Sequence, residues 1–224
     1  MYLSNTTLKE FEACPHCFYL DKKLNIKKPP PIIAGVLNAI DRAMKDQFDD
    51  FRVQGGPPKH ATVELPKGWV LFSSQVALKK MRHWKSGLQY ENAKGFTLIG
   101  ALDDLMFNPA TGLYMPLDYK SKGKATDEAS TEKFYQLQGD IYSLLLEENG
   151  YQTTGKAMFV YYRPSEIDPA NEMLWECQAI QIDADKERAR DVFDRASACL
   201  LSPNAPKQSD DCAMCQYVEA RQKL

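Results

Sequence analysis

The sequence IGALDDLMFNPATGLYMPLDYKSKGK, residues 99–124, determines the fold expected for this chain. Residues 96–108 and 113–121 each indicate a strand, and Pro-Ala-Thr-Gly at 109–112 indicates the turn that joins them. Both strands of this predicted hairpin carry charged side chains among apolar ones. We therefore expect the chemistry of the protein at the hairpin, and a supporting scaffold around it.

Two aspartates and a lysine come together in the hairpin. Asp103 lies on the first predicted strand and Asp118 on the second, so the turn brings the two carboxylates side by side. Lys120 projects from the same strand face as Asp118. Phosphodiester hydrolysis requires a divalent ion that activates water, hard ions such as Mg²⁺ take carboxylate oxygens, and a nearby ammonium stabilises the phosphate. Spacing alone favours ordinary surface residues, because a D-x-K triplet is common, so the surrounding sequence has to decide.

Helices and strands alternate on both sides of the hairpin. Helices are predicted over 6–13, 35–54, 74–85, 127–149 and 185–201, a short hairpin over 61–72, and strands over 156–163 and 174–182. Strands between helices predict an α/β domain with a mixed central sheet flanked by helices. A chain of 224 residues can bury one sizeable core, so we expect residues 1–224 to form a single domain.

The overall charge gives no support to nucleic-acid binding. The chain has 28 basic and 30 acidic residues and a net charge of -2, so any DNA contact requires a local patch. The most basic stretch is the helix around 79–85, where basic and aromatic residues are interleaved. Lys80, Arg82 and Trp84 are candidates to hold phosphates and stack bases, although an ordinary solvated helix face fits the same composition.

No segment of the sequence predicts a membrane span or an export signal. The longest apolar runs, at 157–162 and 144–146, are far shorter than the roughly 20 residues that a membrane helix needs. The first residues, MYLSNTTLKEF, lack the basic start and apolar centre of a secretory signal. We therefore expect a cytoplasmic protein with no membrane partner.

Four of the six cysteines form two C-x-x-C pairs, one near each end of the chain: Cys14 with Cys17, and Cys212 with Cys215. Cytosolic thiols stay reduced, so a disulfide framework is not expected. One C-x-x-C turn supplies two thiolates to a metal, and two turns complete a tetrahedral set. Zinc and an iron–sulfur cluster both satisfy four thiolates, and the spacing does not separate them.

A shared metal would join the two ends of the chain. We expect a core over about residues 32–201 and a cysteine-ligated metal knob formed by the termini, about 1–31 and 202–224. Such a link closes nearly the whole chain into a loop, so the metal would stabilise the fold.

Three sequence motifs occur in an informative order. They are IGALDD at 99–104, PLDYKSKGK at 116–124 and FYQLQGDIY at 134–142, and LSNTTLKEFEACP at 3–15 precedes them. These stretches resemble the G-x-x-D strand, the D-x-K strand, the Q-x-x-x-Y helix and the opening helix of the PD-(D/E)XK nuclease superfamily. Within it, the chain is most similar to the RecB-like branch, which includes CRISPR-associated and AddB-type iron–sulfur nucleases.

The resemblance implies a restriction-endonuclease-like core and a role for each motif residue. Asp103 and Asp118 would bind Mg²⁺ or Mn²⁺ with the backbone carbonyl of Tyr119, and Lys120 would assist the attacking water. Gln138 would support this site from the neighbouring helix.

Two helical positions add to this comparison. Tyr142, one turn after Gln138, would touch DNA or brace that glutamine, and simple packing is an equally weighted alternative. RecB-like nucleases often carry a histidine ligand three residues after a glycine in an early helix, whereas here Gly35 is followed by Asn38. Asn38, or Asp41 one turn later, would have to replace that histidine.

The resemblance also favours a four-iron cluster over zinc at the cysteines. The usual pattern in the branch is one cysteine near the start of the chain and three near the end, whereas this chain has two and two. It implies a metal-dependent deoxyribonuclease, an exonuclease or end-processing enzyme on single-stranded or frayed DNA, working with repair or CRISPR-type partners. The alternatives are a catalytically weak nucleic-acid-binding module of such a complex, and a metal-stapled interaction protein without a nucleic-acid role.

Overall fold

The strands form two mixed sheets in the computed structural model, which describes residues 1–29, 35–56, 63 and 65–223. The smaller sheet has the order β1 (Tyr2–Ser4), β4 (Thr97–Gly100), β3 (Leu88–Glu91). The larger sheet has the order β2 (Val70–Leu71), β5 (Asp104–Asn108), β6 (Leu113–Ser121), β7 (Lys156–Ile167), β8 (Met173–Asp183). Only β1 with β4 and β6 with β7 pair in parallel among these strands.

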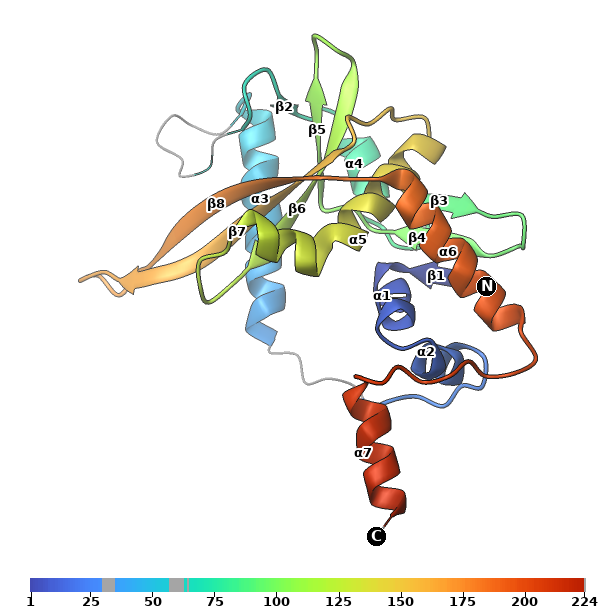
Figure 1. Ribbon diagram of the computed structural model, residues 1–224. Coiled ribbons are helices and arrows are strands. Elements are labelled where there is room, and N and C mark those ends of the chain that lie inside the picture. The colour runs from blue at the N-terminus through green and yellow to red at the C-terminus, as the bar shows by residue number, and fades with distance from the viewer. Residues whose placement is uncertain (30–34, 57–62, 64, 224) are drawn as a thin grey trace.

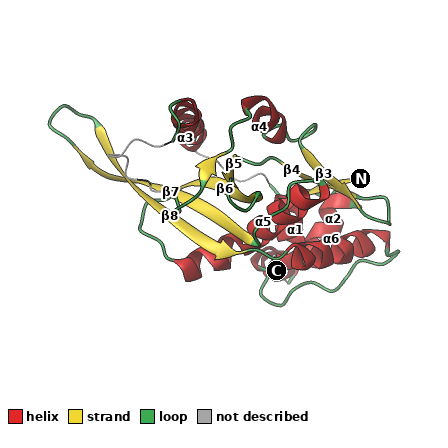
Figure 2. Ribbon diagram, turned by 90° about the horizontal axis from the view of Figure 1, so that it is seen from above, coloured by secondary structure: helices red, strands yellow, loops and turns green. Residues whose placement is uncertain are grey.

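Helices cover both faces of the larger sheet. Figure 2 shows α3 (Gly35–Val53) on one face and α5 (Glu128–Glu148) on the other, and α6 (Lys186–Leu201) packs against α5. The remaining helices are α1 (Asn5–Ala13), α2 (Pro15–Lys22), α4 (Gln75–Met81) and α7 (Ala213–Gln222). In Figure 1, α1 and α2 lie beside α6, and α7 lies next to α2 although the two are at opposite ends of the chain. The predicted α/β fold with mixed sheets and helical flanks is confirmed. None of the described helices is long and apolar enough to cross a membrane.

Strand β6 is the central element because its two faces carry different side chains. Leu117 and Tyr119 belong to the buried cluster under α3, which includes Phe48. Asp118 points the other way and accepts a hydrogen bond from Gln138 of α5. This alternation follows from the two-residue period of a strand. The parallel partner β7 requires a crossover, which α5 supplies.

Helix α5 is fixed at its start and closely approached by β4. The Asp127 carboxylate caps the helix by accepting from the Ser130 N–H at 2.8 Å. A Cβ at Gly100, the last residue of β4, would lie only 2.5 Å from Leu145 of α5. A side chain at this position would have to displace the end of Leu145, so glycine lets the strand end close against this helix.

The prediction of one continuous strand over 96–108 is wrong. The segment forms β4 and β5, which belong to different sheets, and Asp103 lies between them. After the close contact at Gly100 the chain leaves the small sheet, and the Leu102 N–H donates to the Met81 carbonyl of α4. The hairpin of β5 and β6 around the turn at 109–112 is present as predicted.

Two other boundaries differ from the sequence-based expectation. The helix predicted over 74–85 ends at Met81. The short hairpin predicted over 61–72 falls partly outside the described residues, and Val70–Leu71 pairs with β5 instead. The N-terminal residues Leu8 and Phe11 belong to the main core cluster, so α1 contributes to the core as well as leading to the cysteines.

Candidate active site and cysteine cluster

Asp118 lies at the centre of the candidate active site and is only 2% exposed. Its Oδ1 accepts a hydrogen bond from Gln138 Nε2 at 2.7 Å and lies 3.2 Å from the Tyr142 hydroxyl. Its Oδ2 contacts the Lys120 ammonium but accepts no hydrogen bond of good geometry from any described group. Oδ1 is therefore held by α5. Oδ2 is buried beside Lys120 and can still bind a cation.

The environment of Asp118 favours its protonated form. Burial in the core and the charge of Asp103 raise the pKa of Asp118 to about 7, against the opposing effect of the Lys120 ammonium. A divalent ion reverses this preference, because its charge favours the carboxylate.

Asp103 completes the pair of carboxylates from the connection between β4 and β5. Its Oδ2 accepts a hydrogen bond from the Tyr119 backbone N–H at 3.3 Å, which holds it beside Asp118 on β6. Its Oδ1 forms an ion pair with Lys45 of α3 at 2.9 Å. Burial lowers the pKa of Lys45, but the charges of Asp103 and Asp41 outweigh this effect and raise it.

Lys45 is a site residue that the sequence analysis did not identify. Its ammonium bridges Asp103 and Asp41, whose Oδ2 lies at 2.7 Å. The signal that could have revealed it is its position four residues after Asp41 on the same helix face. Asn38, in the place of the expected histidine, is exposed, whereas Asp41 reaches the site through Lys45.

A network of buried charges supports the strand ends beneath the site. Asp104 is fully buried and is bound by Arg52 of α3 and by the Tyr119 hydroxyl. Arg82 donates to the Asp103 carbonyl at 2.7 Å and forms an ion pair with Asp49 at 2.7 Å. These contacts fix the backbone that carries Asp103.

The four residues expected to meet DNA lie in two different environments. Lys80 and Trp84 are exposed. The guanidinium of Arg82 belongs to the buried network, and Tyr142 is 6% exposed with its hydroxyl donating to the Ala101 carbonyl at 3.0 Å. Because Tyr142 Oη also accepts from Gln138 at 2.9 Å, its contacts favour bracing of that glutamine.

The donor set fits a hard divalent cation. Asp103 and Asp118 offer carboxylate oxygens, and the buried Asp118 Oδ2 is contacted by the Lys120 ammonium but accepts no hydrogen bond of good geometry among the described residues. The Tyr119 side chain is on the opposite face, where its ring lies 4.7 Å from that of Phe48, so only its backbone can face the carboxylates. Oxygen ligands of this kind suit Mg²⁺ or Mn²⁺.

The four paired cysteines form a second cluster, at the junction of the termini. Their sulfur atoms all lie within 4.8 Å of one another, and the closest contact joins Cys17 and Cys215 at 3.5 Å. Cys14 is the N-cap of α2, and Cys212 is the N-cap of α7. Both pairs therefore lie at a helix N-terminus, whose dipole favours thiolate, whereas burial favours the neutral thiol.

The thiols of the cluster differ in acidity. Burial raises the pKa of Cys14, but hydrogen bonds from Ser209 and Cys17 outweigh it and lower the pKa to about 6. Burial raises the pKa of Cys17 to about 11. Such a group of neighbouring thiols can hold a metal, either zinc or an iron–sulfur cluster.

The comparison with known families agrees with this geometry. The sequence profile of the PD-(D/E)XK nuclease superfamily matches residues 2–220, which is almost the entire chain. No curated protein matches the chain. The match includes the carboxylate pair, its lysine and the cysteine pairs at both ends. The chain therefore belongs to the PD-(D/E)XK nuclease superfamily, a family of metal-dependent nucleases.

Proposed function

We propose that the protein is a Mg²⁺- or Mn²⁺-dependent deoxyribonuclease of the RecB-like branch that acts as an exonuclease or end-processing enzyme on single-stranded or frayed DNA. The observation that carries the proposal is the meeting of Asp103, Asp118 and Lys120 at one end of β6, with Gln138 bound to Asp118. Repair or CRISPR-type proteins are the proposed partners.

Each residue of the centre has a specific task in this proposal. Asp103, Asp118 and the Tyr119 carbonyl would hold the divalent ion, which when bound would activate a water and neutralise phosphate charge. Lys120, whose ammonium lies over the Tyr135 ring at 4.7 Å, orients that water and stabilises charge that develops on the phosphate. Gln138 fixes the Asp118 carboxylate, and Tyr142 fixes Gln138.

The cysteine cluster has a structural role in the proposal. Four thiolates at the junction of α2 and α7 would hold a four-iron cluster, with zinc as the alternative. A broad visible absorption band in anaerobically purified protein would indicate the iron–sulfur cluster. A colourless protein that contains stoichiometric zinc would contradict this assignment.

A second candidate function is a catalytically weak DNA-binding module. It is favoured by Asn38 in the position of the expected histidine and by Lys45, whose ammonium occupies one oxygen of Asp103. The intact set of Asp103, Asp118 and Lys120 favours the enzyme instead, because a site that has lost its reaction has no need of all three.

The test is cleavage of end-labelled single- and double-stranded DNA in the presence of Mg²⁺ or Mn²⁺. We expect metal-dependent cutting, reduced about 10²–10³-fold by Lys120→Ala, the range for loss of a group that stabilises transition-state charge. The matched control is Lys156→Ala, which removes a lysine of β7 in an exposed ion pair with Asp183. Folded, cysteine-metal-loaded protein that binds DNA without cutting it would establish the binding module.

A further inference from the structure

The surface beside Lys120 combines unpaired lysines with an exposed aromatic ring. Lys9 of α1, Lys122 after β6 and Lys133 of α5 have no carboxylate within ion-pair distance in the part of the chain that the structure describes. Phe134 of α5 is 54% exposed at the same place. We call these four residues the Phe134 patch.

Two lysines of the patch lie near the ring of Phe134, and the third contacts the backbone of the same residue. The Lys133 ammonium lies 5.6 Å from the ring centroid and the Lys122 ammonium 5.7 Å. Lys9 donates to the Phe134 carbonyl at 2.8 Å. Ammonium groups beside an exposed ring are the two components that bind single strands, since the cations hold phosphates and the ring stacks on a base.

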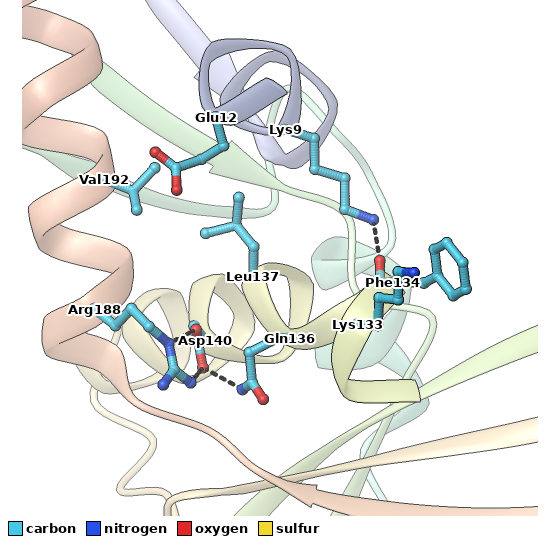
Figure 3. A pocket seen from close by; sticks show the side chains of 9 residues that line it. All are labelled: Lys9, Glu12, Lys133, Phe134, Gln136, Leu137, Asp140, Arg188 and Val192. Carbon is cyan, nitrogen blue, oxygen red and sulfur yellow. Dashed lines mark hydrogen bonds and ion pairs between the residues drawn. The ribbon is translucent and has the colours of Figure 1, made fainter. Parts of the chain in front are cut away.

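A cavity of about 460 Å³ adjoins the patch between α1, α5 and α6. Figure 3 shows Leu137 and Val192 at its apolar side and Lys9 directed toward Phe134 at its rim. This volume lies in the range of small-ligand sites, so it is large enough for one nucleoside.

The charge that remains in the cavity is positive. Its carboxylate Asp140 is bound by Arg188, with the closer contact at 2.5 Å, and Figure 3 shows this pair. Its second carboxylate, Glu12, forms an ion pair with Arg195 at 3.0 Å. The acidic groups are thus neutralised by arginines, whereas Lys9 remains available to a phosphate.

The Phe134 patch is adjacent to the candidate active site. The ammonium groups of Lys9 and Lys120 lie over the same ring, that of Tyr135, at 5.1 and 4.7 Å from its centroid. The charge of Lys120 also contributes, after burial, to the lowered pKa of Lys9. The Lys9 ammonium is therefore a neighbour of the Lys120 ammonium, at the edge of the candidate active site.

We propose that the Phe134 patch and its cavity form the binding site for the single-stranded part of the substrate, with a base stacked on Phe134 and neighbouring phosphates held by Lys9, Lys122 and Lys133. The inference rests on the proposed nuclease function and adds the place where the strand is held. The interior of a DNA duplex does not fit this site, because its bases are already stacked on one another and offer no free face to Phe134.

A second surface with an exposed aromatic ring is the alternative binding site for the single strand. Trp84 lies with Tyr2, Lys85 and Ile99 around a separate cavity of about 290 Å³. Among the described residues, Lys85 is the only cation that lines this cavity, and its ammonium lies 4.9 Å from the Trp84 ring. We favour the Phe134 patch because it offers three unpaired lysines and a direct connection to Lys120.

The test measures strand binding without cleavage, by fluorescence anisotropy of a labelled single strand of about 15 nucleotides in buffer without divalent ions. Phe134→Ala should weaken binding by about 5- to 150-fold, the effect of losing one stacked base, whereas Phe134→Tyr should retain it. The matched control is Tyr217→Ala on α7, which removes an aromatic ring that is 60% exposed. Because Phe134 is exposed, these variants should fold, and their melting temperatures verify this.

The lysines are tested by the salt dependence of the same binding curve. Lys122→Ala and Lys133→Ala should each reduce the slope of log K against log salt by about 0.7, the value for one phosphate of a single strand. Undiminished binding by Phe134→Ala, with loss of binding by Trp84→Ala, would overturn the proposal and place the strand on the other surface.

The outcomes separate this inference from the nuclease proposal. If the protein cuts no DNA but Phe134→Ala still weakens strand binding, the binding site stands and the catalytic function fails. If the protein cuts DNA and Phe134→Ala binds as well as the wild type, the nuclease stands and this site is wrong.

Discussion

The carboxylate centre and the cysteine cluster are both groups of ionisable side chains contributed by distant segments, but they differ in the groups that surround them. Asp103 and Asp118 already have cationic partners in Lys45 and Lys120, and Gln138 holds one oxygen of Asp118. The cysteine sulfurs have mainly one another as neighbours, at 3.5–3.9 Å.

This difference indicates what each site requires. The carboxylate centre is organised by strand β6, helix α5 and buried charges, so it can hold its shape before a divalent ion binds. The cysteine cluster joins two short helices at opposite ends of the chain, α2 and α7, through thiols that contact one another. We infer that the cysteine metal serves folding and the divalent ion serves chemistry.

The largest expected effect is on stability, from Cys14→Ser. The variant should lose its metal, and its melting temperature should fall by about 10 °C or more, since binding of a structural metal is folding free energy and each kcal/mol shifts a chain of this size by about 2–4 °C. Metal analysis and thermal unfolding measure this loss. Cys199→Ser is the matched control, because Cys199 lies outside the cluster. Full metal content in Cys14→Ser would contradict the inference that this cysteine cluster binds a metal that serves folding.

The second effect concerns support of the carboxylates by α5. Tyr142→Phe removes the hydroxyl that accepts from Gln138 and lies near Asp118 Oδ1, and should weaken Mn²⁺ binding by about 10–100-fold. Titration calorimetry measures the affinity. Tyr90→Phe, which removes a hydroxyl that accepts from Arg190, is the control and should bind Mn²⁺ as the wild type does. Equal affinities of the two variants would show that α5 does not organise the centre.

The third effect is a pH-dependent change in stability without divalent ions. The pKa of Asp118 is raised from 3.8 to about 7 in the folded protein by burial and by the charge of Asp103. The stability gained from the protonated carboxyl is present below pH 3.8 and is lost as the pH rises toward 7. Asp118→Asn does not titrate, so its melting temperature relative to the wild type should increase by a few degrees over this window.

Thermal unfolding of both proteins across that pH range measures the difference. The matched control is Asp183→Asn, because the ion pair with Lys156 lowers the pKa of this exposed carboxyl. It should show no such increase. A constant difference between Asp118→Asn and the wild type would show that Asp118 is already ionised without metal.

The smallest expected effect comes from Lys45→Met. The Lys45 ammonium lies 2.9 Å from Asp103 Oδ1 and repels an incoming cation, so its removal should tighten Mn²⁺ binding a few-fold. Lys94→Met, which breaks an exposed ion pair with Asp194, is the control for loss of one positive charge. Weaker Mn²⁺ binding by Lys45→Met would show instead that the lysine positions Asp103 for the ion.

Much of the site could be predicted because its signals are local. Asp118 and Lys120 share a strand face through the two-residue period, and Gln138 and Tyr142 share a helix face through their spacing of four. The turn at 109–112 brings the strands of the β5–β6 hairpin together, and the two C-x-x-C pairs carry their own metal-binding pattern.

Other features depended on contacts between segments far apart in the chain. Lys45 reaches Asp103 from 58 positions away in sequence numbering, and Lys9 reaches the Tyr135 ring from the first helix. The break after Gly100 depends on how closely α5 approaches β4. No pattern among neighbouring residues in the sequence indicates these contacts.

The sequence by itself determined the family, the α/β class and the principal chemical groups, because strand alternation, helix spacing and metal-ligand motifs are properties of neighbouring residues. Only the tertiary structure decided that Arg82 and Tyr142 hold the site from within, and that Phe134 and its lysines are exposed beside Lys120. The physical reason is burial: whether a charge or ring meets solvent, a buried partner or DNA depends on which elements pack over it.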